Sequence, residues 1–139
     1  ETGEAVFFRN SHAPSSSFLK VLSTHVKAFP HTETTTEVMV PITRLDAILH
    51  TLRIEPRILV KIDVQGYELE VLKGGSLLLG CFDFLLVECS YIELYKGQVL
   101  ADEVVNYVEK AGFVLVEHNT LVYDKKGQPI QADFFFRRK

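Results

Sequence analysis

The sequence predicts an α/β domain with a mainly parallel sheet, flanking helices and an antiparallel C-terminal hairpin. Two nearly continuous apolar runs, at residues 57–64 and 82–90, are typical of strands buried on both faces of a parallel sheet. Helical patterns at residues 66–75 and 100–113 separate these runs from each other and from a third run at 113–119. Strands that alternate with helices at this spacing favour βαβ crossovers, which join parallel strands.

Length and composition indicate a single globular domain over residues 1–139. The chain is 47% hydrophobic and 24% charged with a formal net charge of -3, so it lacks the basic surface that nucleic acid binding requires. No segment reaches the roughly 20 apolar residues that span a bilayer, and we expect no membrane partner. Two cysteines are too few for a disulfide framework, and Cys89 lies in an apolar run as a buried thiol would. These features predict a reducing, cytoplasmic location.

The N-terminal third is expected to be irregular, because Pro30 and the threonines at 34–36 discourage long helices. In chain order we predict a strand at residues 5–9, a surface loop at 10–18, one or two helical turns within 17–26, a strand at 36–45 and a short helix at 45–52.

The later elements have clearer boundaries. The helix at 66–75 ends in two glycines suited to a C-cap. The helix at 100–113 places Val104 and Val108 on one face together with Val105 and Ala111, and it stops at Gly112. The final segment, residues 121–138, is predicted to form a hairpin with its turn at Lys126–Gly127.

The candidate chemistry lies at the ends of the two buried strands. Side chains alternate along a strand, so Lys61 and Asp63 share one face of the first, and Glu88 lies near the end of the second. Ligands of open α/β sheets bind at the carboxyl ends of the strands. Parallel pairing would therefore bring Asp63 and Glu88 to the mouth of one pocket.

Most of the charged residues in this region also have a purely structural interpretation. Asp63 could accept hydrogen bonds from the turn amides of Gln65 and Gly66. Glu68 falls in a first helical turn, where the helix dipole stabilises a carboxylate. Lys61 is expected to pair with a neighbouring carboxylate. Neither helix capping nor a solvent-exposed position explains the glutamate at position 88.

Other candidates are weaker. Tyr91 and Tyr95 follow the second strand and could line a pocket or pack beneath a loop. The serines at 15–17 lack a nucleophile-elbow pattern. The five histidines show no metal-ligand spacing, so we predict no metal site and regard each as exposed or incidental: His12, His25, His31, His50 and His118.

The middle of the chain resembles the FkbM-type family of S-adenosylmethionine-dependent methyltransferases. The resemblance is carried by "LVKIDVQGYELEVLKGG", "LLVECSYIELYKGQ", "AGFVLVEHN" and "QADFFFRR", and more loosely by "PSSSFL" and "VPITRLDAIL", so it covers nearly the whole chain. The most specific part matches the family's order at Lys61, Asp63, Gln65, Gly66 and Glu68.

The resemblance implies a partial Rossmann-like, class I methyltransferase fold. The strand ending at Asp63 would be the fourth of the family's seven strands, and the one ending near Glu88 the fifth. None of the eight glycines forms a GxG near a strand end, unlike the family's cofactor-binding loop. The chain also begins without methionine, so we expect a processed or truncated C-terminal portion of a methyltransferase domain, inactive on its own.

The activity implied by the resemblance is methyl transfer from S-adenosylmethionine to a hydroxyl of a sugar, lipid or other small-molecule acceptor. Such a displacement needs the hydroxyl aligned and its proton removed. We assign Asp63 to the reacting centre and the cofactor, as a base in preference to a ligand of a divalent ion, because the sequence offers no complete set of metal ligands. The further assignments are Glu88 as a catalytic group and Gln65, Glu68, Tyr91 and Tyr95 as acceptor-binding groups.

Two other functional classes stay open. The chain could be a non-enzymatic α/β binding or assembly domain derived from the same fold, or an unrelated α/β hydrolase or transferase. Without a preceding strand, residues 58–63 would leave an unpaired apolar edge, which favours aggregation. We therefore expect that edge to be covered by residues 5–9, by residues 38–42, or by a second copy of the chain in a homodimer.

Overall fold

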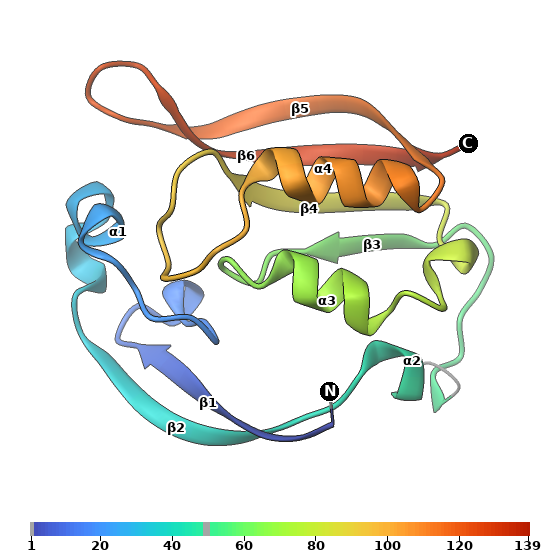
Figure 1. The fold of residues 1–139 in the computed structure, drawn as a ribbon, viewed down its shortest axis with the longest axis horizontal. Coiled ribbons are helices and arrows are strands. Elements are labelled where there is room, and N and C mark those ends of the chain that lie inside the picture. The colour runs from blue at the N-terminus through green and yellow to red at the C-terminus, as the bar shows by residue number, and fades with distance from the viewer. Residues whose placement is uncertain (1, 49–50) are drawn as a thin grey trace.

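The strands form two separate sheets in the computed structural model, which describes residues 2–48 and 51–139 (Figure 1). An N-terminal antiparallel pair contains β1 (Gly3–Asn10) and β2 (Thr35–Ile42). The second sheet has the order β3-β4-β6-β5, with β3 (Leu59–Ile62), β4 (Phe84–Ser90), β5 (Phe113–Tyr123) and β6 (Pro129–Arg138). The helices are α1 (Ser23–Ala28), α2 (Leu45–Ile48), α3 (Glu68–Gly74) and α4 (Ala101–Lys110), and short 3-10 turns occur at Ala13–Ser15, Pro30–Thr32 and Leu79–Cys81.

The α/β class is confirmed, but the expectation of a mainly parallel sheet is wrong. Among the described strands, only β3 and β4 pair in parallel, whereas β4–β6, β5–β6 and β1–β2 are antiparallel. The physical reason lies in the final hairpin. The helical crossovers do keep β3, β4 and β5 in one direction, but β6 turns back and inserts between β4 and β5, so that both of its pairings are antiparallel.

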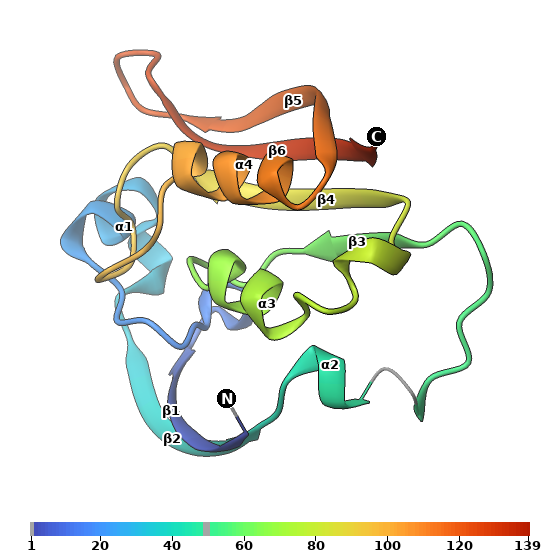
Figure 2. The ribbon, with the colours of Figure 1, turned by 45° about the vertical axis from the view of Figure 1, so that its right-hand side comes forward.

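The core lies on one face of the four-stranded sheet. Both views show α3 and α4 on the same side of this sheet (Figures 1 and 2). On that side Leu85, Val87 and Cys89 of β4 are almost fully buried, and they cluster with Leu72 of α3 and Val108 of α4. This alternation along β4 as far as Cys89 fixes which side chains lie on the opposite face.

Helix α4 follows from its sequence pattern. Ala101, Val104 and Val108 recur at helical spacing and are all buried against the sheet. Gly112 ends the helix at a φ of 96°, a left-handed conformation that glycine adopts without strain, and its N–H donates to Glu109 O at 3.1 Å. The prediction for this helix is confirmed, apart from a slightly earlier end.

Several predicted boundaries shift. Strand β3 is half the length of the predicted 57–64 run, and the N-terminal helix lies later than expected, at Ser23–Ala28. The predicted helix at 45–52 is seen as α2 over its first turn, and residues 49–50 lie outside the described part. The hairpin turn is confirmed, since Gly127 has a φ of 78° and its N–H donates to Asp124 O at 3.0 Å.

The outer edge of β3 is not covered by either N-terminal strand. Strands β1 and β2 pair with each other, and within the described residues β3 pairs with β4 alone. Leu59 of β3 is 55% exposed. The expectation that residues 5–9 or 38–42 cover this edge is therefore wrong, because β1 and β2 form a separate two-stranded sheet and neither strand pairs with β3. A second copy stays a prediction.

Among the described residues, no helix has the length and apolar character that crossing a bilayer would demand.

Replacing Leu85 by alanine should lower the free energy of unfolding by about 2–5 kcal/mol, because the side chain is 0% exposed and its loss leaves a cavity. Urea unfolding followed by circular dichroism measures this loss. The matched control is Leu77→Ala, since Leu77 is 81% exposed and the change should stay within about 0.5 kcal/mol. Equal losses in the two variants would show that β4 does not form the core.

Candidate functional site

The turn after β3 is the structural basis of the site. Gln65 has a φ of 54° and Gly66 a φ of 96°, so two successive residues are left-handed, and only the second is a glycine. A non-glycine residue in this region is uncommon and tends to occur where the surroundings hold it in place. Here the Ser17 hydroxyl donates to Gln65 O at 2.7 Å, which ties the turn to the N-terminal loop.

Glu68 closes the turn from the helix side. Its Oε1 accepts from the backbone N–H of Gly66 at 2.9 Å and, more weakly, from that of Val64 at 3.4 Å. The residue is 3% exposed, and burial raises the pKa of its carboxyl. Glu68 thus lies in the first turn of α3 and faces the backbone, while its acceptor-binding role stays a prediction.

The Gln65 side chain joins two carboxylates. Its Nε2 donates to Asp63 Oδ1 at 2.9 Å and to Glu88 Oε1 at 3.2 Å. Because β3 and β4 are parallel with Ile62 opposite Val87, the residues that follow reach the same edge of the sheet. The structure therefore brings Asp63 and Glu88 together, as the strand pattern predicts, and adds an amide between them.

Strand β6 completes the surroundings of Glu88. Gln131 Nε2 donates to Glu88 Oε1 at 2.9 Å, and Asp133 lies directly opposite Glu88 in the ladder. Burial and then the nearby charges of Asp63 and Asp133 raise the pKa of Glu88 to about 7, while the Gln65 amide acts in the opposite direction. A carboxyl of this kind exchanges protons near neutral pH.

Lys61 supplies the nearest positive charge. Its Nζ lies 3.3 Å from Asp63 Oδ2, and this hydrogen bond raises the pKa of the lysine. Asp63 therefore accepts from Gln65 on one oxygen and from Lys61 on the other. Both partners are partly exposed, so the pair contributes little to stability.

A hollow of about 240 Å³ opens beside these carboxylates. Its walls come from the N-terminal loop region, from the turn after β3, and from β4, β5 and β6. The polar residues that matter for chemistry are His12, His25, His31, Asp63, Gln65, Glu88 and Gln131. A small hydroxyl-bearing molecule would have acceptors and proton-exchanging groups on more than one side.

Tyr95 lies beneath this hollow and not on its surface. The residue is 1% exposed, and its hydroxyl lies 2.9 Å from Gln65 Oε1 and 3.0 Å from His25 Nε2. The backbone N–H of Tyr95 donates to Gln98 Oε1 at 3.2 Å, which holds the loop. Burial raises the pKa of the phenol, so Tyr95 keeps its proton.

Tyr91 lies on the other side of β4. It packs against Phe134 with ring centroids 5.9 Å apart, and its backbone N–H donates to Ile130 O at 2.8 Å. Tyr91 contributes no wall to the 240 Å³ hollow. The acceptor-binding roles of Tyr91 and Tyr95 stay predictions.

The prediction that each histidine is exposed or incidental is wrong for His25. His25 is 2% exposed and hydrogen-bonded through both ring nitrogens, to Thr32 at 2.9 Å and to Tyr95 at 3.0 Å. His12 and His31 are exposed but stack edge-on, with centroids 4.4 Å apart, at the rim of the hollow. No regular spacing links these residues, so no pattern in the sequence indicated them. The prediction for His50 lies outside the described residues.

Metal coordination has no geometric support in residues 2–48 and 51–139, where no group of three His, Cys, Asp or Glu side chains is arranged to hold an ion.

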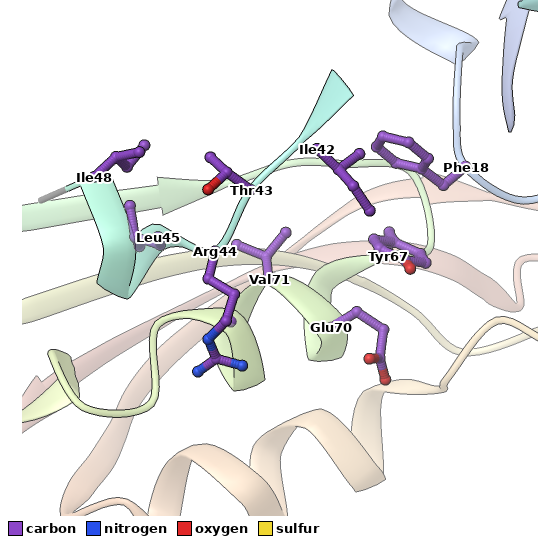
Figure 3. Close-up of a pocket in the computed structure, with 10 residues that line it drawn as sticks. Phe18, Ile42, Thr43, Arg44, Leu45, Ile48, Tyr67, Glu70 and Val71 are labelled. Carbon is purple, nitrogen blue, oxygen red and sulfur yellow. The ribbon is translucent and has the colours of Figure 1, made fainter. Parts of the chain in front are cut away.

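A larger hollow of about 500 Å³ lies elsewhere, between α3 and the segment that joins β2 to α2 (Figure 3). Figure 3 shows Ile42, Leu45 and Val71 pointing into it, with Arg44 and Glu70 at its side. The lining has an apolar majority and holds no group of neighbouring carboxylates. The smaller hollow is therefore the better candidate site despite its size.

A model described as the methyltransferase FkbM domain matches residues 1–115, which is most of the chain. The chain belongs to the FkbM methyltransferase family. The matched region contains β3, the turn with Gln65, and β4 with Glu88, so the whole carboxylate pair lies within the FkbM domain. No curated protein and no solved structure matches the chain.

Glu88→Gln should stabilise this FkbM domain at pH 8. The folded-state pKa of about 7 lies above the ordinary value of 4.5, so the stability that Glu88 contributes is complete below pH 4.5 and is lost as the pH rises through 7. Glutamine removes that loss, and we expect a gain of roughly 1–3 kcal/mol at pH 8 and a flatter pH dependence between pH 4.5 and 7.

Urea unfolding at pH 5 and pH 8 measures this difference. Glu117→Gln, an exposed glutamate on β5 of the same sheet, is the control and should change stability by less than about 0.5 kcal/mol at either pH. A Glu88→Gln variant that gains nothing at pH 8 would contradict the raised pKa.

Proposed function

We propose that this FkbM domain serves the transfer of a methyl group from S-adenosylmethionine to a hydroxyl of a sugar, lipid or other small-molecule acceptor. The observation that carries the proposal is the Asp63–Gln65–Glu88 arrangement, in which one amide holds two carboxylates at the carboxyl ends of parallel strands. Membership of the family supplies the reaction class. The acceptor class and the use of S-adenosylmethionine are parts of the proposal itself.

Glu88 is the proposed base. A base is most effective when its pKa lies near the working pH, and burial places that of Glu88 at about 7. Its Oε1 already accepts from Gln65 and Gln131, which fixes the direction of the carboxylate. The acceptor hydroxyl would give its proton to Glu88 as its oxygen becomes the nucleophile, and the neighbouring charge of Asp63 strengthens the proton affinity of Glu88.

S-adenosylmethionine supplies an electrophilic methyl group on a positively charged sulfur. The negative charges of Asp63, Glu88 and Asp133 suit such a cation, and Asp63 is the most exposed of them and the one we place next to it. Among the described residues, no strand is followed by a glycine-rich turn that could cradle the methionine end. The described residues would therefore contact the cofactor only where Asp63, Glu88 and Asp133 lie.

Charge should thus decide which cofactor analogue binds. We expect sinefungin, which carries an ammonium in place of the sulfonium, to bind roughly tenfold more tightly than S-adenosylhomocysteine, whose thioether sulfur is uncharged and whose binding should be weak. Amide chemical shifts at Asp63, Gln65 and Gly66 during a titration measure both affinities. Asp63→Asn should remove the preference, whereas Asp124→Asn in the distant β5–β6 turn should keep it.

Equal affinity for the two analogues would contradict the proposed cofactor position. Tight binding of S-adenosylhomocysteine would contradict the expectation that the described residues form half of a site.

The exposed edge of β3 favours a second candidate function, an assembly module. Leu59 is 55% exposed beside an edge that no other described strand pairs with. Such an edge is a template for strand addition. We propose that a second copy of the chain covers it in a homodimer.

Sedimentation equilibrium tests this assembly. The native chain should sediment as a dimer, and Leu59→Lys should make it a monomer because a charge on an edge strand opposes pairing. Leu77→Lys is the matched control, since Leu77 is 81% exposed but lies outside every strand. A native chain that stays monomeric at high concentration would contradict the proposal.

A further inference from the structure

Strand β6 supplies a residue of the site that lies outside the family match. The FkbM domain model matches residues 1–115, whereas Gln131 lies on β6, which runs between β4 and β5 (Figure 1). Side chains alternate along a strand, so Gln131 shares a face with Asp133, the residue directly opposite Glu88. Gln131 is therefore a diagonal neighbour of Glu88, within reach of a long side chain.

The hydrogen bond to Glu88 determines which way the Gln131 amide faces. A base must be ionised before it takes a proton, and an ionised carboxylate only accepts hydrogen bonds. The contact of 2.9 Å between Gln131 and Glu88 Oε1 must then come from the NH₂ group of the amide. The carbonyl oxygen of the same amide is consequently directed away from this contact.

That carbonyl oxygen is an acceptor without a donor. Among the contacts of the described residues, Gln131 Oε1 has no hydrogen bond, although the residue is only 7% exposed. Buried polar groups are nearly always paired, so an open acceptor on a buried side chain indicates a missing partner. Gln131 also lines the hollow of about 240 Å³ beside the carboxylates, where a bound molecule would supply that partner.

The other amide of the site has no such open end. Gln65 also donates to Glu88 Oε1, at 3.2 Å, but its own Oε1 lies 2.9 Å from the Tyr95 hydroxyl. Both amides thus contact the same oxygen of Glu88, and Oε2 has no donor among the described residues. Two neighbouring oxygens are therefore open to a ligand, Glu88 Oε2 and Gln131 Oε1.

We propose that Gln131 is a specificity-determining residue, which accepts a hydrogen bond from a second hydroxyl of the acceptor while Glu88 Oε2 takes the proton of the first. Because the Gln131 amide is hydrogen-bonded directly to Glu88, the two open oxygens suit hydroxyls on adjacent carbons. The acceptor is then a polyol with neighbouring hydroxyls, as in a sugar ring, and not a lipid with a single hydroxyl. This choice among acceptors rests on the proposed function, in which Glu88 is the base.

The supply of hydrogen-bond donors agrees with a polyol. Asp63 and Asp133 lie beside Glu88, so the surroundings of the two open oxygens are rich in acceptors. A molecule with one hydroxyl has one such proton, which Glu88 takes, and Gln131 Oε1 would stay without a donor. An acceptor left unpaired in a complex lowers affinity, so such a molecule should bind less tightly.

Two isomeric diols test the proposal in the native chain. The probes are trans-1,2-cyclohexanediol and trans-1,4-cyclohexanediol, which contain the same atoms and differ in the spacing of their hydroxyls. We expect the 1,2 isomer to bind roughly fivefold more tightly, because only its second hydroxyl reaches Gln131 while the first contacts Glu88. Side-chain amide shifts of Gln131 during titrations at pH 8, without a cofactor, measure both affinities.

Replacing Gln131 by leucine should abolish this preference, since leucine has a similar volume but accepts no hydrogen bond; backbone amide shifts then report binding. Gln128→Leu is the matched control, because Gln128 is exposed in the β5–β6 turn and should keep the fivefold difference. Gln131→Leu should also raise the pKa of Glu88, since a donor to its charged form is lost. Carbon-13 titration of the carboxyl measures that rise, which a role in packing alone would not produce.

Equal affinities of the two diols for the native chain would overturn the proposal, as would an absence of binding by the 1,2 isomer or a preference that persists in Gln131→Leu. If Gln131→Leu does not fold, the comparison in the native chain still decides. Failure of sinefungin to bind would count against the proposed methyl transfer alone, since the diol titrations involve no cofactor.

Discussion

The site depends on one amide, that of Gln65, held between two carboxylates. Two negative groups placed this close repel each other, and the partial burial of Glu88 makes the repulsion stronger because water screens it less. The Gln65 NH₂ group donates to both, at 2.9 Å and 3.2 Å, and the left-handed backbone at Gln65 aims it there. Gly66, Ser17 and Glu68 hold that backbone, so the turn, the N-terminal loop and the start of α3 all serve this contact.

The arrangement also explains why the domain keeps groups that cost stability. Glu88 lies on the face of β4 opposite the core, where a leucine or valine would be more favourable for folding. Its raised pKa is the measure of that cost, since burial penalises the charged form. A partly buried carboxylate at the end of a strand and a left-handed non-glycine residue beside it are both expected at a functional site. At such a site the residues serve a reaction and not the packing of the core.

The sequence predicted the parts of the structure that follow from local periodicity. The alternation along β3 and β4 placed Asp63 and Glu88 at one edge, because a strand's side-chain period of two is insensitive to the rest of the fold. The insertion of β6 between β4 and β5 was not predicted, because a hairpin pattern specifies the turn of the hairpin and not which other strand it pairs with. The hydrogen bond from Gln131 to Glu88 was missed for the same reason. His25 and Tyr95 are 70 residues apart and meet through irregular loops, so no periodic pattern relates them.

The pKa of Glu88 in the native chain is the measurement that tests this account most directly. Carbon-13 titration of the side-chain carboxyl should give a value near 7, and Asp63→Asn should lower it, because the neighbouring charge is removed while the Gln65 amide remains. A value near 4.5, unchanged by Asp63→Asn, would mean that Glu88 is neither buried nor close to Asp63, and it would contradict the site as described.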